Sequence, residues 1–171
     1  MNRMKKILLS LFCVICLSVN AQIQRNFLNF KLGLTSLSQV KTYFRNHGKE
    51  WKQTNNSRTI QVHDVQFGGV DWKAVFFEFY KGKLYLVHFQ DLGDETPREL
   101  LDSRWKRLYQ SYMQKYQDFY SGENYEDIEF DDGITRLVAN YSIFRGYKGI
   151  SLIYYDIRLF NEMRKSDNDE L

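Results

Sequence analysis

The side chains of this chain that most often carry out chemistry are three histidines and two cysteines. Cys13 and Cys16 have the Cys-x-x-Cys spacing of a redox pair. They lie within an apolar run near the start of the chain, so we interpret this spacing as chance. His47, His63 and His88 have neither His-Glu-x-x-His nor His-x-His spacing, so a zinc site would need ligands from distant segments. We therefore expect structural histidines and predict no catalytic residue, metal or cofactor.

Six acidic residues form the densest charged segment of the chain. They are Glu123, Glu126, Asp127, Glu129, Asp131 and Asp132. Calcium is one interpretation, because hard cations are bound by several carboxylates, but the spacing differs from that of an EF-hand loop. The other interpretation is a solvated strand, since Asp127, Glu129 and Asp131 would point to one side of it. We favour the solvated strand.

An aromatic hairpin is predicted around the turn Lys81-Gly82. With a two-residue turn, alternation places Val75, Phe77, Phe79, Leu84 and Leu86 on one face of the hairpin. The same alternation places Phe76, Tyr80, Tyr85, Val87 and Phe89 on the other face. Helices on one side of a sheet cover only one of these faces, so the second set is our candidate binding face. Two alternatives are a sheet that buries both faces and a register shifted by one residue.

The first 21 residues have the organisation of a secretory signal peptide. Arg3, Lys5 and Lys6 precede the apolar run 7–19, and Val19-Asn20-Ala21 is typical of a cleavage site. The run is shorter than the roughly 20 residues that span a bilayer. Neither cysteine follows a small residue, so we expect no lipid anchor. The sequence predicts an exported, periplasmic or extracellular protein that begins near Gln22.

The excess of positive charge belongs to this leader. The 24 basic residues of the chain include its three cations, so 21 basic residues face 21 acidic residues in the remainder. Nucleic-acid binding needs a surplus of clustered lysine and arginine, which the remainder lacks. We therefore predict no nucleic-acid partner.

Helix and strand signals predict one α+β domain over residues 22–160. A Ser-x-x-Gln capping box opens a helix at 36–47, and Thr96-Pro97-Arg98-Glu99 opens another at 97–119. Three strands follow each helix, and the last one spans 150–160. Residues 161–171 are polar, and we expect a disordered tail.

This element order is that of two helix-plus-three-strand units, at about 32–91 and 96–160. Consecutive strands pair as antiparallel neighbours, so we expect an antiparallel sheet with both helices on one face. The alternation of apolar residues changes phase near His63-Asp64, which indicates a bulge or bend in that strand.

A motif in the first unit carries a resemblance to a group of known proteins. Leu32-Gly33-x-x-Ser36-Leu37-Ser38-Gln39-Val40 precedes an aromatic strand, a Lys-Gly-Lys hairpin and a Leu-x-x-Val strand. This pattern resembles small exported bacterial proteins of unassigned function. Their units resemble the repeats of the beta-lactamase inhibitory protein and the small lipoprotein of the outer-membrane protein assembly machine. The resemblance implies the fold and a binding role, and it transfers no site residues. This chain departs from both relatives because it has no disulfide in the expected domain, no lipid-bearing cysteine and one helix per unit.

These observations predict a non-catalytic accessory module that binds a protein, a peptide or another ligand outside the cytoplasm. Its partner would be an envelope or extracellular protein or peptide. One alternative is a structural or assembly factor of the cell envelope. A hydrolase with carboxylates that converge only in the fold is a further alternative.

Overall fold

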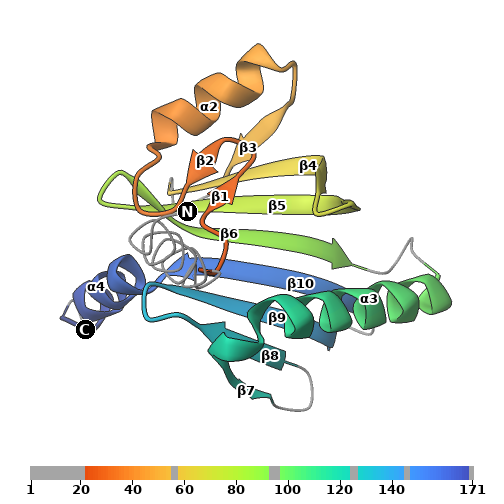
Figure 1. Ribbon diagram of the computed structural model, residues 1–171. Coiled ribbons are helices and arrows are strands. Elements are labelled where there is room, and N and C mark those ends of the chain that lie inside the picture. The colour runs from red at the N-terminus through yellow and green to blue at the C-terminus, as the bar shows by residue number, and fades with distance from the viewer. Residues whose placement is uncertain (1–21, 55–57, 93–96, 124–126, 145–146, 170–171) are drawn as a thin grey trace, which may run out of the picture.

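A large antiparallel sheet dominates the computed structural model, which describes residues 22–54, 58–92, 97–123, 127–144 and 147–169 (Figure 1). The predicted leader 1–21 and Thr96 lie outside the described residues. The eight-stranded sheet has the order β3-β4-β5-β6-β10-β9-β8-β7. Its strands are β3 (Trp51–Gln53), β4 (Thr59–Phe67), β5 (Val70–Tyr80), β6 (Lys83–Leu92), β7 (Tyr120–Glu123), β8 (Asp127–Asp131), β9 (Thr135–Phe144) and β10 (Tyr147–Asp156). The short strands β1 (Asn26–Phe27) and β2 (Phe30–Lys31) pair separately.

The expected α+β class is confirmed, but the expected number of strands is wrong. Four strands, and not three, follow each of the two predicted helices. The additional strands, β3 and β7, have three and four residues and form the two edges of the sheet. Such short edge strands lack the period-two pattern that makes a longer strand visible in a sequence, and they protect a sheet against pairing with another chain.

Both predicted helices form. Helix α2 (Leu37–Asn46) begins with the predicted capping box, in which Ser36 and Gln39 exchange side-chain and backbone hydrogen bonds. Helix α3 (Arg98–Tyr116) continues into the 3-10 turn η1 (Gln117–Phe119). Both helices contribute side chains to the main core, including Phe44 from α2 and Tyr116 from α3.

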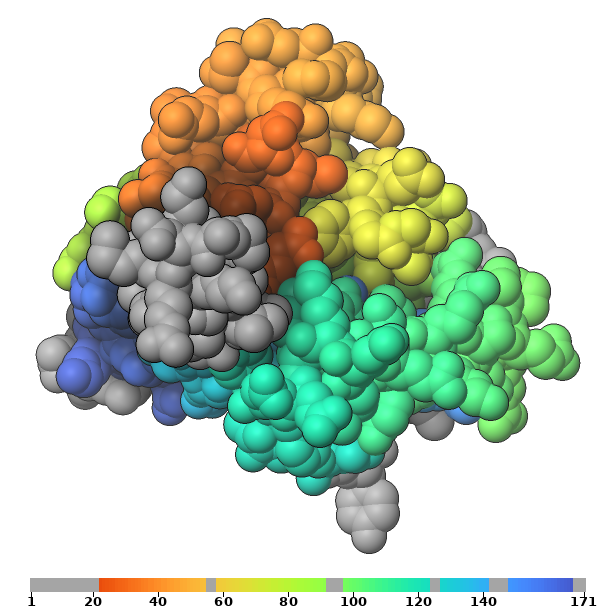
Figure 2. Space-filling view, in the orientation of Figure 1, coloured from red at the N-terminus to blue at the C-terminus, as the bar shows by residue number. Residues whose placement is uncertain are grey.

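One face of the sheet carries this core. A row of cross-strand partners runs through six strands, and each member is 0% exposed: Ile60, Phe77, Val87, Tyr154, Leu137 and Phe130. We call these residues the core row. Helices α2 and α3 and the β1–β2 hairpin lie over this face (Figure 2). Phe27 of the hairpin contacts Phe67, Phe89 and Tyr154 with ring centroids 4.7–6.0 Å apart.

The predicted irregularity in β4 is present at Asp64. This residue has a φ of 52°, in the left-handed region that aspartate tolerates better than most residues. Val62 and Val65 are both buried on either side of it, so the alternation changes phase there. The irregularity keeps Phe67 on the core side, where its ring stacks on Phe89 at 4.3 Å.

The C-terminal segment is a helix, which corrects two expectations. β10 ends at Asp156, and α4 spans Ile157–Asp169, so the strand to residue 160 and the disordered tail from 161 were both wrong. Asp156 accepts a hydrogen bond from Leu159 N at 3.0 Å, as an N-cap residue does. Apolar residues of the segment 157–169 recur at helical spacing, but over too few turns to predict a helix from the sequence.

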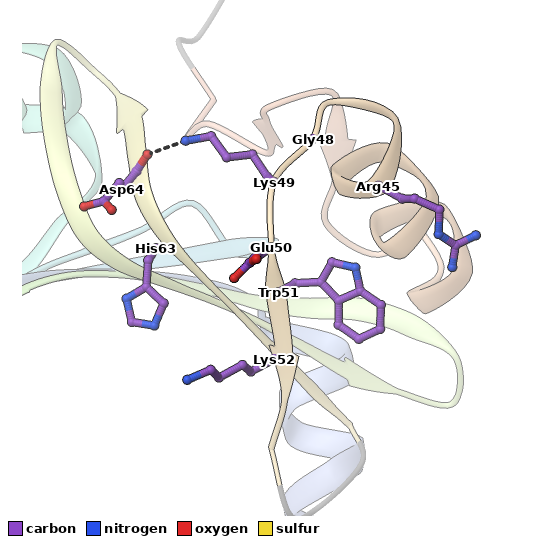
Figure 3. Close-up of a pocket in the computed structure, with 8 residues that line it drawn as sticks. All are labelled: Arg45, Gly48, Lys49, Glu50, Trp51, Lys52, His63 and Asp64. Atoms are coloured by element: carbon purple, nitrogen blue, oxygen red, sulfur yellow. Dashed lines mark hydrogen bonds between the residues drawn. The ribbon is translucent and has the colours of Figure 1, made fainter.

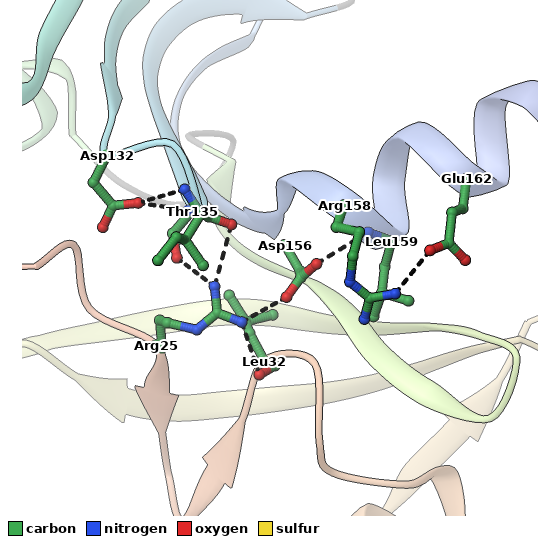
Figure 4. A network of polar contacts seen from close by, with 9 residues as sticks. Arg25, Leu32, Asp132, Thr135, Asp156, Arg158, Leu159 and Glu162 are labelled. Atoms are coloured by element: carbon green, nitrogen blue, oxygen red, sulfur yellow. Dashed lines mark hydrogen bonds and ion pairs between the residues drawn. The ribbon is translucent and has the colours of Figure 1, made fainter.

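A buried polar network fixes the start of α4 (Figure 4). Arg25 forms an ion pair with Asp156 at 2.5 Å and donates hydrogen bonds to Thr135 Oγ1 and Leu32 O at 2.7 and 3.1 Å. Gly33 has a φ of 79°, and a Cβ there would lie 2.8 Å from Asp156 Oδ2. The network joins the N-terminal segment to the β10–α4 junction.

Candidate functional site

The five residues of the predicted binding face lie in three different environments. Val87 and Phe89 are 0% exposed on the core face. Phe76 lies on the opposite face and is partly exposed. Tyr80 and Tyr85 are buried in a second small cluster with Leu159, Phe160 and Met163 of α4 and Leu86 of β6. The expectation that these five residues share one face is therefore wrong.

A β-bulge explains this difference. The turn Lys81-Gly82 forms as predicted, with Tyr80 opposite Lys83, but the register shifts between Glu78 and Phe79. Beyond the bulge Phe77 faces Val87, and not Leu86. A shift by one residue moves every following side chain to the other face. The run from Leu84 to Phe89 is apolar at almost every position, so alternation could not reveal the shift.

The face opposite the core carries the candidate site, and we call it the open face. A row of cross-strand partners crosses seven strands from β3 to β8: Lys52, Gln61, Phe76, His88, Ile153, Val138 and Glu129. We call these residues the central row. Lys52 is exposed and the other six are partly exposed. The four middle residues of the row are Phe76, His88, Ile153 and Val138, and all except His88 are apolar. We call these four residues the apolar strip.

Two further rows flank the central row. The polar row contains His63, Ala74, Gln90, Ser151, Asn140 and Asp127. The row nearest to α4 contains Thr59, Glu78, Leu86, Tyr155, Arg136 and Asp131. The open face thus combines an apolar strip with amide and hydroxyl groups on one side, which is the composition of many binding surfaces.

His88 occupies the middle of the central row. Its Nε2 is buried and has no hydrogen-bond partner. Burial lowers the pKa of His88 to about 4, because the charged imidazolium is poorly solvated there. Its ring lies 5.6 Å from that of Phe76. At neutral pH the side chain is therefore an uncharged ring with one unsatisfied nitrogen.

Helix α4 forms a wall at one end of the open face. Leu159 packs on Tyr80 and Tyr85, and Phe160 contacts Tyr155 with ring centroids 4.6 Å apart. The helix leaves β10 at Asp156 and reaches the β5–β6 turn at Glu162, which pairs with Lys81 at 3.3 Å. It therefore runs across the strands, in the same direction as the rows.

One end of the central row is basic. Lys52 and His63 project from the same side of β3 and β4, whereas Trp51 and Arg45 project from the other (Figure 3). A hollow of about 680 Å³ is lined by these four residues among others. Its cationic groups point apart, and Lys49 Nζ donates to the Asp64 carbonyl at 3.1 Å. They do not form a convergent cradle for an anion.

The other end of the central row is acidic. Asp127, Glu129 and Asp131 point to the open face, as their alternation predicted. Arg136 pairs with Asp131 at 2.8 Å and reaches Glu129 at 4.0 Å, and Asn140 donates a hydrogen bond to Asp127. Asp132-Gly133 has the residue types of a two-residue hairpin turn, which would place Glu129 opposite Arg136. In the structure Glu129 is instead opposite Val138.

The two other histidines, His47 and His63, make local contacts that are typical of structural residues. His47 Nδ1 lies 2.8 Å from Tyr43 O, and its ring stacks on Tyr43. His63 Nδ1 lies 3.0 Å from Lys73 O. Within the described ranges, no three histidine, cysteine or carboxylate side chains are grouped so that they could hold a metal.

Comparison with protein-family models, with curated proteins and with solved structures found no match for this chain. Among the described helices, none is long and apolar enough to cross a membrane. The site must therefore be interpreted from its own geometry. That geometry is a long, partly apolar strip with unlike charges at its two ends.

Proposed function

We propose that this protein is an exported, non-catalytic binding module whose open face holds a protein or peptide. One observation carries the proposal: the central row keeps Phe76, Ile153 and Val138 partly exposed on a sheet whose other face carries the buried core row. The core row supplies the burial that the sheet needs, so the apolar strip is not required to complete the core. Contiguous exposed apolar residues with polar neighbours mark interaction surfaces.

The unsatisfied nitrogen of His88 supports the same interpretation. A buried polar atom without a partner has a free-energy cost of about 1–3 kcal/mol. This nitrogen is closed to solvent in the unbound chain, so a ligand can satisfy it only if the His88 ring turns toward the open face on binding. His88 would then contribute specificity, while its apolar neighbours contribute most of the affinity.

We also infer that the sheet consists of two units, α2 with β3–β6 and α3 with β7–β10. The strand order supports this, because it reads outward from the β6–β10 junction in the same sense on both sides. His88 and Ile153 face each other across this junction. The centre of the proposed binding surface would therefore lie where the two units meet, a common position for ligand sites.

Site-specific photo-crosslinking in intact cells tests the proposal. Benzoylphenylalanine replaces Ile153 on the open face and, as the control, Lys106 on an exposed position of α3. We expect a discrete adduct of higher mass from position 153 and none from position 106. The absence of an adduct at 153, and also at Val138, would reject the binding role of this face.

A further inference from the structure

The backbone of the open face restricts what its occupant can be. Six of the seven strands beneath the central row, all except the edge strand β3, have neighbours on both sides, so their backbone groups already belong to the ladders. An extended peptide laid on this face would find no backbone partners and would place its own N–H and C=O groups over apolar side chains. A helix satisfies its backbone groups internally, so it avoids that cost.

Helix α4 restricts the occupant further. A second sheet would pack about 10 Å above this face, in the layer that α4 already occupies at one end. The central row lies two residues, or about 7 Å, along the strands from the Leu86 and Tyr155 row that α4 contacts. Neighbouring helices pack 8–10 Å apart. A helix beside α4 would therefore lie over the central row and reach the polar row.

The length and charge of the central row describe this helix. From Lys52 to Glu129 the row crosses six strand spacings, about 29 Å, which equals about 19 helical residues. The row begins with a cation at Lys52 and ends with the carboxylate of Glu129. Around this end the three carboxylates of Asp127, Glu129 and Asp131 face the single cation of Arg136, so the end keeps an excess of negative charge. A complementary helix carries acidic residues at one end, basic residues at the other and an apolar stripe between them.

We propose that the occupant of the open face is an amphipathic helix of about five turns, with ends of opposite charge, that lies beside α4 across the strands. The proposal rests on the proposed binding function and specifies its partner. The apolar stripe contacts Phe76, Ile153 and Val138. The acidic end lies over Lys52, and the basic end lies over Glu129.

Synthetic peptides test this directly against the purified chain from Gln22 onward. The probe is an 18-residue peptide with leucine at helical spacing, glutamate in its first turn and lysine in its last turn. Two control peptides carry glutamate at both ends or lysine at both ends, and a third is the probe with a central proline. We expect the probe to bind about fivefold more tightly than either charge control, which corresponds to one surface ion pair. The proline peptide should not bind, because proline breaks the helix.

A charge reversal at Lys52 makes the test specific. In Lys52→Glu both ends of the row are acidic, so the peptide with lysine at both ends should become the tightest ligand. Lys106→Glu on α3 is the matched control and should leave the order of affinities unchanged. Equal binding of all peptides, equal binding of the proline peptide, or no binding at about 1 mM would overturn the helical occupant. If position 153 still forms an adduct in cells, such a result rejects the helix and leaves the binding function intact; without the adduct, both fail.

Discussion

The two faces of the sheet use the same strands and differ in what covers them. Along β9 and β10, buried and partly exposed residues alternate one by one, so Leu137 and Tyr154 are fully buried while Val138 and Ile153 are not. Helices α2 and α3 and the β1–β2 hairpin complete the first face. Among the residues that the structure describes, α4 covers one end of the second face. The core row is apolar throughout, whereas the central row of the open face keeps Phe76, Ile153 and Val138 among polar and charged residues. This contrast is the reason that we propose a binding role for the open face.

The strongest test of this difference is a pair of truncations at adjacent residues. Phe77→Ala in the core row should lower the free energy of unfolding by about 3–5 kcal/mol, because it leaves a cavity among buried rings. Phe76→Ala on the open face should lower it by about 1 kcal/mol, because its ring is already partly hydrated. Urea unfolding of both variants measures the two values. Equal losses would show that the open face is a second core.

Asp156 tests whether the wall of the open face depends on the buried network. Asp156→Ala removes the ion pair to Arg25 and the cap of α4, and leaves Arg25 without its buried partner. We expect a loss of about 3 kcal/mol in the free energy of unfolding. Glu162→Gln, which affects only exposed ion pairs of the same helix, should change it by less than about 0.5 kcal/mol. Similar effects from both variants would contradict the role given to the network.

His88 gives the open face a pH dependence that the core row lacks. Its pKa is about 4 in the folded chain, against 6.5 for an unperturbed histidine. Between these values the unfolded chain binds more protons than the folded chain. The contribution of His88 to the free energy of unfolding is therefore fully present above about pH 6.5 and is lost as the pH decreases toward 4. At pH 5 the loss should be about 2 kcal/mol. His88→Leu should remove this part of the pH dependence, and an unchanged slope in urea titrations between pH 7 and pH 5 would refute the assignment.

The parts of the fold that depend on short segments could be predicted from the sequence. The capping box at Ser36, the turn at Lys81-Gly82 and the phase change at Asp64 each involve only a few neighbouring residues, and all three are present. The shared orientation of Asp127, Glu129 and Asp131 also followed from period-two alternation alone.

The parts that depend on long-range pairing could not be predicted. The bulge at Glu78/Phe79 moved Val87 and Phe89 into the core, and an apolar run contains no signal for such a shift. Ile153 and Val138 were missed because they join Phe76 only through the pairing of β6 with β10 and of β10 with β9. Alternation shows that a strand has two faces, but not which strand lies beside it.

Cysteine footprinting in the cell envelope is the most direct test that the open face is occupied. The chain from Gln22 onward contains no cysteine, so Ile153→Cys and the control Lys106→Cys each introduce a single thiol. Maleimide labelling rates are compared between the purified protein and intact envelopes. The account predicts that labelling at position 153 is at least about tenfold slower in the envelope, with an unchanged rate at position 106. Only the uncovered thiol reacts, and a bound state favoured by more than about 1.4 kcal/mol over the free state leaves less than about one tenth of the thiols uncovered. Equal rates at position 153 in both samples would contradict it.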